Sequence, residues 1–480
     1  MIVHHMPPAG VAQSEEFRVF ANGEEVFVRH DPRCSYDFVD FAGNVYKHVS
    51  DRPAFAILCT DGPVHFEIAC SRPFRELKIR PLSAGIRWQY EGGRIVFDMP
   101  EPKKLSLEFD NNLHDPLFLF VSPVETDIPD RNDPNVRWFE TGKVHEVGLV
   151  ELHAGETVYI EDGALVIGTF FAKNAENIRI CGHGVLSDVL ANPKGAGGRA
   201  VWFKHCRNIR VEGITMFYTA SPRWQLVPDA CKDVFIDDVN IITHAPSGDG
   251  IDIVSCEHAR ISNCFIKAND DCIVVKACAR DENGVPERLD CKDVVSENCV
   301  LWSATHGDGV DVGFELICKE VCDIVFRNLD IIHCEHEGYQ AGTAIGIHNS
   351  DDALAHDILF EDIRIEDAQQ KLIDVKVVKA IWSTTETRGR IRNVTFRNIQ
   401  VVDGEMPASI IRGFESAESI FRIEYEGEGA DRRFFVRRDL NGEGCVADIT
   451  IDGLYDHGKR ARSAADAKMV IEIATDVKFI

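Results

Sequence analysis

The chain has 480 residues and a formal net charge of −26, with 45% hydrophobic and 27% charged residues. This length exceeds that of an ordinary single core, so it indicates two domains or an elongated repeat with an added module. The composition is typical of a soluble globular protein, and the negative charge disfavours nucleic acid, anionic membranes and long polyanions as partners.

The N-terminal segment MIVHHMPPAGVAQSEEF lacks the apolar stretch of a secretory signal. No apolar run reaches the length of about 18 residues that suggests a membrane span. Unless a signal has been removed, we therefore expect a cytoplasmic protein. Its 16 cysteines would then be reduced thiols, because the cytosol disfavours disulfides.

The beginning of the chain contains short strand-like runs between turns. Apolar and polar residues alternate in HFEIAC (65–70) and KLSLEFD (104–110), and this period of two predicts strands with one buried face. We interpret residues 1–121 as an N-terminal β-sandwich domain. The Pro- and Asp-rich stretch 122–138 is expected to be a linker, and residues 139–480 a second domain.

In the second domain one alternating phrase recurs along the chain. It stands at NIRICGHGVL (177–186), NIRVEGITM (208–216), DVFIDDVNI (233–241), HARISNCFI (258–266), DVVSENCVL (293–301), DIVFRNLDI (323–331), DILFEDIRI (357–365), NVTFRNIQV (393–401) and DITIDGL (448–454). Most phrases begin only 25 to 36 residues after the preceding one. These steps leave no room for helices between strands, so an all-β fold is expected, with the stacked coils of a parallel β-helix.

The cysteines fit such stacking. Four of them each stand two residues before a phrase: Cys206, Cys231, Cys256 and Cys291. Two others share a position within their phrases: Cys264 and Cys299. Equivalent positions of a solenoid lie one strand spacing apart, so we predict ladders of buried thiols. A metal site is not expected, because no CxxC pair or clustered Cys/His spacing occurs.

Acidic residues recur at one position of three successive coils. Aligning the apolar pairs of SGDGIDI (247–253), NDDCIVV (269–275) and HGDGVDV (306–312) brings Asp249, Asp271 and Asp308 into one column. Asp270 lies beside this column, and His306 precedes Asp308 by two residues.

Two interpretations of this column compete. Aspartates are common turn residues that cap nearby N–H groups, and this could explain any one of them. Stacked carboxylates, however, repel one another. Their crowding keeps a proton on one group while another stays ionised, and glycoside hydrolysis requires this combination. We therefore favour a catalytic site.

Several segments resemble glycoside hydrolase family 28, which includes polygalacturonases and rhamnogalacturonases. They are SPRWQL (221–226), PDACKDVFIDDVNI (228–241), PSGDGIDIVSC (246–256) and NDDCIVVKA (269–277). The loop ARDENG (279–284) is similar to the bacterial branch, and an N-terminal sandwich before the helix is similar to the dextranases of family 49. The resemblance implies a right-handed, pectin-lyase-like parallel β-helix and hydrolysis with inversion.

The resemblance also implies roles for the aspartates. Asp270 matches the general acid, while Asp249 and Asp271 match the pair that holds and deprotonates the attacking water. The family's histidine column holds Gly307 and Asp308 here, so either the displaced His306 or Asp308 itself would replace that histidine.

The coil that carries the family's Arg-Ile-Lys motif, which grips the substrate carboxylate, differs as well. It offers Thr343, His348 and Asn349 instead. The sugar is therefore left open between a pectic type and a neutral one.

Further residues are candidates for substrate binding: Lys276, Glu315, Trp224, His348, His306 and Asp308. Lys276 would hold a sugar hydroxyl or tune Asp270, with a simple ion pair as the plain alternative. Trp224 would stack on a sugar ring, although core packing is the more usual role of a tryptophan. Asp252 and Asp311 are interpreted as turn or supporting groups. Trp302 and Trp382 are interpreted mainly as core, and His244 is a further candidate for the cleft.

The sequence thus predicts an inverting glycosidase that acts on an α-linked pectic-type oligosaccharide or polysaccharide. The alternatives are a dextranase-like hydrolase of neutral α-glucans, a polysaccharide lyase or uronate epimerase, and a carbohydrate-binding β-helix without catalysis. No cofactor or metal is implied. A homo-oligomer is compatible with the sequence but is not required by it.

Overall fold

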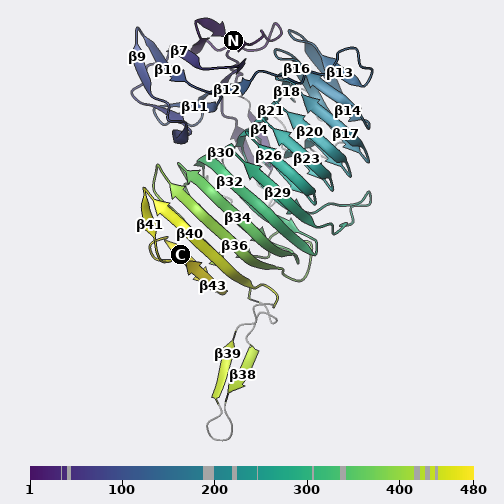
Figure 1. The fold of residues 1–480 in the computed structure, drawn as a ribbon, viewed down its shortest axis with the longest axis vertical. Coiled ribbons are helices and arrows are strands. Elements are labelled where there is room, and N and C mark those ends of the chain that lie inside the picture. Colours follow the sequence, from purple (N-terminus) through teal and green to yellow (C-terminus); the bar gives the residue numbers. More distant parts are fainter. Residues whose placement is uncertain are drawn as a thin grey trace.

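The computed structural model describes residues 1–480 except Cys34, 40–44, 188–198, 219–223, Pro246, 305–306, 336–341, 416–421, 427–432 and 438–441. Regular structure in the described residues consists of strands and one 3₁₀ turn, Leu82–Ala84. The described part of the chain forms no helix with the length and hydrophobicity of a membrane span. A sandwich at the N-terminus precedes a long stack of parallel strands (Figure 1), which confirms the expected all-β architecture.

The sandwich consists of two five-stranded sheets. One has the order β1 (Ile2–Val3), β6 (Ala54–Thr60), β12 (Leu117–Pro123), β11 (Lys104–Phe109) and β8 (Leu77–Arg80). The other has the order β3 (Glu24–Val26), β2 (Phe17–Ala21), β7 (Val64–Cys70), β10 (Arg94–Met99) and β9 (Trp88–Glu91). The short strands β4 (Ser35–Val39) and β5 (Val45–Val49) pair separately. Alternate residues such as Phe66 and Ile68 are buried between the two sheets, as the period of two predicts.

The β-helix starts at β13 and arranges its strands in three columns. The phrase column contains β13 (Val136–Phe139), β15 (Thr157–Ile160), β17 (Glu176–Cys181), β20 (Arg207–Glu212), β23 (Lys232–Asp237), β26 (Glu257–Ser262), β29 (Cys291–Glu297), β32 (Glu320–Cys334), β34 (Leu354–Ile365), β36 (Arg390–Val401), β40 (Val446–Asp456) and β43 (Ala474–Phe479). The site column contains β14 (Val144–Leu152), β16 (Leu165–Lys173), β19 (Arg199–Lys204), β22 (Trp224–Asp229), β25 (Ile251–Val254), β28 (Ile273–Ala277), β31 (Val310–Leu316), β33 (Thr343–Asn349), β35 (Lys371–Val377), β37 (Ala408–Arg412) and β42 (Met469–Glu472). The sandwich-facing column contains β18 (Val185–Ser187), β21 (Thr215–Tyr218), β24 (Asn240–Thr243), β27 (Phe265–Ala268) and β30 (Val300–Ser303), and it continues into β32.

Two short elements leave this pattern near the C-terminus. Strand β41 (Lys459–Ala461) pairs antiparallel with β40. Strands β38 (Arg422–Glu426) and β39 (Arg433–Arg437) form a separate antiparallel hairpin. Figure 1 shows this hairpin beyond the end of the coil stack.

The phrases begin with Asn, Asp or His for a conformational reason. Their first residues all have positive φ, between 50° and 62°: Asn177, Asn208, Asp233, His258, Asp293, Asp323, Asp357, Asn393 and Asp448. Five residues later the backbone is again at positive φ: Gly182, Gly213, Asp238, Asn263, Asn298, Asn328, Asp362, Asn398 and Gly453. Asn, Asp and Gly tolerate this left-handed region better than other residues, so they mark the two corners of each coil.

Apolar ladders fill the interior of the coils. The thiol ladder is confirmed, because the backbone N–H of Cys206, Cys231 and Cys256 each donates to the next sulfur, 3.4 Å away. A second ladder stacks Phe326, Phe360 and Phe396, with ring centroids 5.3 and 5.0 Å apart. All of the cysteines that the structure describes are free thiols.

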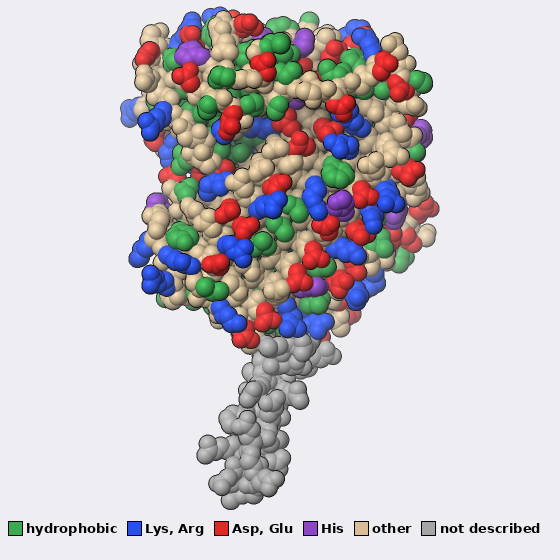
Figure 2. Space-filling view, viewed as in Figure 1, with side chains coloured by type: hydrophobic (Ala, Val, Ile, Leu, Met, Phe, Trp, Pro, Cys, Tyr) green, Lys and Arg blue, Asp and Glu red, His purple; other side chains and the backbone are tan. Residues whose placement is uncertain are grey.

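The sandwich packs against the sandwich-facing column. Phe55, Phe118 and Phe120 of the sandwich meet an apolar row of the β-helix that consists of Phe217, Ile242, Phe265, Trp302 and Ile332. Buried charges join the same surfaces. The Arg80 guanidinium contacts Glu108 of its own domain and Glu366 and Asp403 of the β-helix. Acidic and basic side chains alternate over the face seen in Figure 2 without forming a single-sign patch.

Candidate active site

The strand register confirms the predicted acidic column. Ile251 of β25 pairs with Ile273 of β28, and Ile273 pairs with Val310 of β31. Asp249 and Asp308 each stand two residues before these paired positions, as Asp271 does before Ile273. The paired residues point into the apolar core. The aspartates therefore meet at one edge of the site column, on three neighbouring coils.

A buried lysine organises the first part of the cluster. The Lys276 Nζ lies 3.2 Å from Asp249 Oδ2, 3.4 Å from Asp252 Oδ1 and 3.9 Å from Asp271 Oδ2. Burial opposes a positive charge on Lys276, but the carboxylates, Asp249 first, outweigh it and raise the pKa of the ammonium well above its usual value. Burial and the neighbouring Asp249 also raise the pKa of Asp252. Asp252 therefore belongs to the cluster itself.

The adjacent carboxylates differ in their surroundings. Asp271 is buried, and its Oδ1 accepts a hydrogen bond of 2.9 Å from the backbone N–H of Asp308. Burial and the charge of Asp270 raise the pKa of Asp271. Asp270 is partly exposed, and no ion pair within 4.0 Å joins it to Lys276 among the described residues. Removal from water and the charge of Asp249 raise the pKa of Asp270 to about 8.

The loop before β31 packs directly onto this pair. A Cβ at Gly307 would lie 2.1 Å from the carbonyl carbon of Asp270, so only glycine fits there. Asp308 continues from this contact into a second cluster. Its Oδ1 accepts a hydrogen bond of 2.6 Å from the backbone N–H of Thr343.

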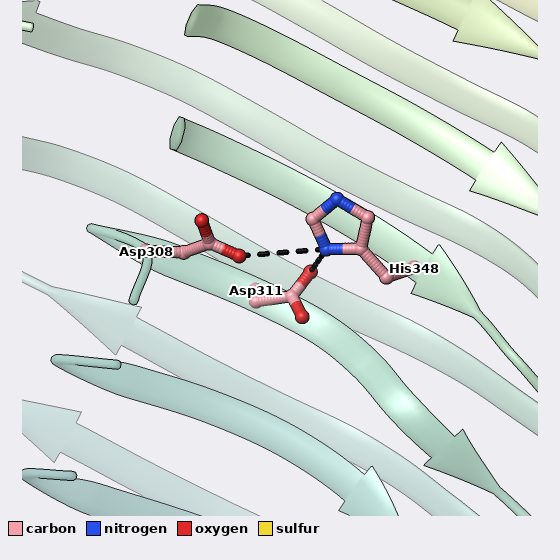
Figure 3. Close-up of side chains that lie close together, drawn as sticks. All are labelled: Asp308, Asp311 and His348. Atoms are coloured by element: carbon pink, nitrogen blue, oxygen red, sulfur yellow. Dashed lines mark hydrogen bonds and ion pairs between the residues drawn. The ribbon is translucent and has the colours of Figure 1, made fainter. Parts of the chain in front are cut away.

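The second cluster centres on His348 (Figure 3). The His348 Nδ1 lies 3.4 Å from Asp308 Oδ2 and 3.1 Å from Asp311 Oδ1, and all three side chains are buried. Burial alone would favour the neutral ring, but the two carboxylates raise the pKa of His348, which favours the imidazolium. Gly346 provides the space, because a Cβ there would lie 2.6 Å from Asp311 Oδ1.

Ligand atoms of Asp308, Asp311 and His348 lie within 4.8 Å of one another, a spacing at which a cation could be held. The same three side chains also interact directly, through the contacts of His348 with Asp308 and Asp311.

The next coil adds residues that the sequence analysis missed. His348 Nε2 lies 3.3 Å from Asp374 Oδ2. Asp374 in turn contacts the ammonium groups of Lys371 and Lys376. The strand register explains their position: Asp374 pairs with Gly346, and Lys376 pairs with His348.

The remaining candidates lie around or outside this centre. Trp224 is partly exposed and has the Lys276 Nζ 4.1 Å from its ring centroid, with the Arg199 guanidinium at 4.9 Å. Glu315 is partly exposed, and its charge contributes to the raised pKa of Lys276. His306 lies outside the described residues.

Three further candidates have structural positions. Trp302 is fully buried against the sandwich, and its indole N–H donates to Glu335. Trp382 packs edge-on against Phe314. The expectation that His244 lines the cleft is wrong: this side chain is buried on the sandwich-facing side, 3.9 Å from Asp51. His244 directly follows strand β24, and this position directs its side chain toward the sandwich domain. The sequence pattern did not reveal this orientation.

Comparison with known proteins identifies a family that these features resemble. Residues 190–412, which include the whole acidic column, match the model of "Glycosyl hydrolases family 28". The chain is a family 28-like protein. Curated relatives of this family 28-like chain include a probable polygalacturonase of Arabidopsis thaliana, 24% identical over 182 residues, which are 38% of this chain and 36% of the relative. Another is a probable polygalacturonase of Vitis vinifera, 31% identical over 90 residues, 18% of each chain.

The family 28-like chain thus spans about a third or less of the length of these relatives. Among solved structures, Dex49A from Penicillium minioluteum is 14% identical, with a TM-score of 0.64 over 98% of this chain and 96% of its own. This likeness covers both domains and shows a shared fold. An exopolygalacturonase from Thermotoga maritima is 18% identical, with a TM-score of 0.49 over 72% of this chain and 84% of its own. Domain boundaries, oligomeric state and cellular location stay predictions from the sequence.

Proposed function

We propose that the protein is a glycoside hydrolase that cleaves α-linked bonds of a pectic-type saccharide with inversion at the anomeric carbon. Its acids are Asp249, Asp270 and Asp271. The match to family 28 over the site and the polygalacturonase relatives support the reaction class and the substrate class.

The observation that carries the proposal is that the Lys276 ammonium contacts three of the four clustered carboxyl groups but not the fourth, Asp270. Lys276 contacts Asp249, Asp252 and Asp271, whereas the partly exposed Asp270 stands outside these ion pairs. Four crowded carboxyl groups with one ammonium do not all ionise, so protons remain in the cluster. Asp270 is the group that keeps a proton and still reaches the substrate.

The proposed mechanism follows from this division. Asp270 donates its proton to the glycosidic oxygen as the bond to the leaving sugar breaks. Asp249 and Asp271 hold a water on the opposite side of the ring and remove its proton as it attacks the anomeric carbon. The backbone N–H of Asp308 orients Asp271, and Lys276 stabilises the ionised base. The attack from the opposite face inverts the configuration.

Proton NMR of the reaction tests this proposal. We expect galacturonic or rhamnogalacturonic oligosaccharides to be hydrolysed, with the β-anomer appearing first. Asp270→Asn should lower kcat by about 10²–10⁴, because it removes the proton donor. The matched control Asp476→Asn changes an exposed aspartate and should leave kcat unchanged.

Other products would identify other reactions. The α-anomer appearing first would exclude inversion, and unsaturated products that absorb in the ultraviolet would indicate a lyase. Unimpaired ligand binding without turnover would indicate a binding protein. A second candidate substrate is a neutral α-glucan, which is favoured because the coil with Thr343, His348 and Asn349 lacks the family's carboxylate-gripping Arg-Ile-Lys motif. Isomalto-oligosaccharides in the same panel decide between the two.

A further inference from the structure

Two lysines on β35 share a single buried carboxylate. The Lys376 Nζ lies 2.8 Å from Asp374 Oδ2, and the Lys371 ammonium contacts the same oxygen. Asp374 has no exposed surface, whereas the side chains of Lys371 and Lys376 are 15% and 24% exposed. The buried acid therefore contacts both ammonium groups, and the two lysine side chains are partly exposed.

These lysines lie on the same face as the candidate acids. Asp374 pairs with Gly346 in the strand register, and Gly346 pairs with Asp311. Contacts run without interruption from Asp308 through His348 to Asp374. A saccharide that extends along this face from Asp271 toward the C-terminus would pass over the lysines.

The charge of the face reverses along this path. On one side of His348 stand two carboxylates, Asp308 and Asp311. On its other side one carboxylate, Asp374, contacts two ammonium groups. Two ammonium groups share this single carboxylate, so an additional anion beside them would be stabilised. Burial and the nearby Lys376 lower the pKa of Lys371 to about 8.

The lysines are distant from the reacting bond. Strands β28, β31, β33 and β35 are consecutive neighbours in the site column. Three spacings of about 4.8 Å place the backbone of β35 about 14 Å from that of β28 along the axis. This distance separates them from the sugar that is cleaved.

We propose that Lys371 and Lys376 form a subsite that binds the carboxylate of a uronic acid unit, beyond the sugar at the cleavage point. The subsite determines specificity for an acidic saccharide and takes over the role of the Arg-Ile-Lys motif that the preceding coil lacks. This inference rests on the proposed function, because it assigns the sugar that the same face accepts. The lysines bind substrate remotely, so they affect KM for longer chains and not the chemical step.

Kinetics on matched substrates test the subsite. The variants are Lys376→Gln, Lys371→Gln and the double substitution, with Lys379→Gln as the control at an exposed lysine just after the strand. The substrates are oligogalacturonides as free acids and as their methyl esters, from dimers to longer chains. We expect the double substitution to raise KM at least about 10-fold for long free acids, with kcat, dimers and methyl esters unaffected. Each single variant should show a smaller effect, and Lys379→Gln none.

Two results would overturn the subsite: an equal change of KM on acids and esters, or no change on either. Lys376→Gln keeps Lys371 on Asp374, so it provides the comparison if the double variant does not fold.

If the wild type hydrolyses none of these substrates, the proposed function fails and the subsite is judged separately. Calorimetry with the free-acid oligomers then compares the wild type with Lys376→Gln. Weaker binding by the variant supports the subsite, and equal or absent binding refutes it.

Discussion

Asp270 is partly exposed and has a raised pKa. The raised pKa affects the stability of the fold as well as the proposed chemistry. Its pKa of about 8 in the folded protein compares with 3.8 for an ordinary aspartate. A carboxyl whose pKa is raised on folding binds more protons in the folded state between these values. Asp270 therefore contributes a loss of stability as the pH rises from about 4 to about 8.

Asp270→Asn should remove this pH-dependent loss. We expect the variant to be more stable than the wild type by about 0.5–2 kcal/mol at pH 8, with the difference shrinking toward pH 4. Thermal unfolding followed by circular dichroism across this range measures the effect. Asp476→Asn should follow the wild type at every pH. A variant that is less stable than the wild type at pH 8 would mean that the Asp270 carboxylate stabilises the fold.

The sequence was sufficient to locate the acids but not their partners. Period and phrase alignment brought Asp249, Asp271 and Asp308 together, because identical offsets in a solenoid become neighbouring positions. Asp374 and its lysines escaped this reasoning. They lie in KLIDVKV (371–377), which contains neither a glycine turn nor a carboxylate before the strand. Only the register of β33 with β35 brings them to the site.

At the scale of the strand, two corner positions and an apolar ladder define each coil. The corners could have been predicted, since Asn, Asp, His or Gly recurs at the first and sixth residues of every phrase. The thiol ladder was predicted from the same spacing. What the sequence could not supply was which side of each coil would receive the sandwich, because Trp302 and Lys267 alternate with core residues as solvent-facing side chains would.

The thiols of the ladder should not react with alkylating reagents in the folded protein. Burial raises the pKa of Cys291 to about 12 and that of Cys231 well above its ordinary value. A pKa of about 12 leaves a thiolate fraction on the order of 10⁻⁵ at pH 7. We expect mass spectrometry after iodoacetamide treatment to find Cys231, Cys256 and Cys291 unlabelled until denaturant unfolds the coils.

Cys70 is the internal comparison for this labelling, because its side chain is partly exposed. It should react before the ladder does. Rapid labelling of Cys256 in protein with an unchanged circular dichroism spectrum would contradict a closed ladder and would indicate that the coils open locally.

At the scale of the whole molecule, a charged histidine links the two domains. His333 of β32 lies between Glu108 of the sandwich and Asp367 of the β-helix, with 3.0 Å contacts on both ring nitrogens. These carboxylates outweigh burial and raise the pKa of His333 to about 9. The resulting stabilisation is fully present below about pH 6.5 and is lost as the pH rises through about 9.

Domain docking should therefore weaken in alkaline solution. We expect limited proteolysis to release the sandwich faster above about pH 9 than at pH 7. His333→Gln should remove most of this pH dependence and cost about 1–3 kcal/mol at pH 7, because Glu108 and Asp367 lose a charged partner. His457→Gln, at an exposed histidine, is the control. An unchanged pH profile in His333→Gln would assign the docking to the apolar contacts around Phe118.

The candidate site takes its side chains from several neighbouring coils, and this arrangement has an evolutionary consequence. The nine coils with the repeated phrase keep apolar residues inside and the same two corners, whatever their outward side chains are. Mutation can then exchange the outward groups of one coil while its neighbours retain their geometry. The proposed reacting centre at Asp249, Asp270 and Asp271 and the proposed carboxylate subsite three coils further on are thus separable traits, and selection can change the substrate preference without rebuilding the centre.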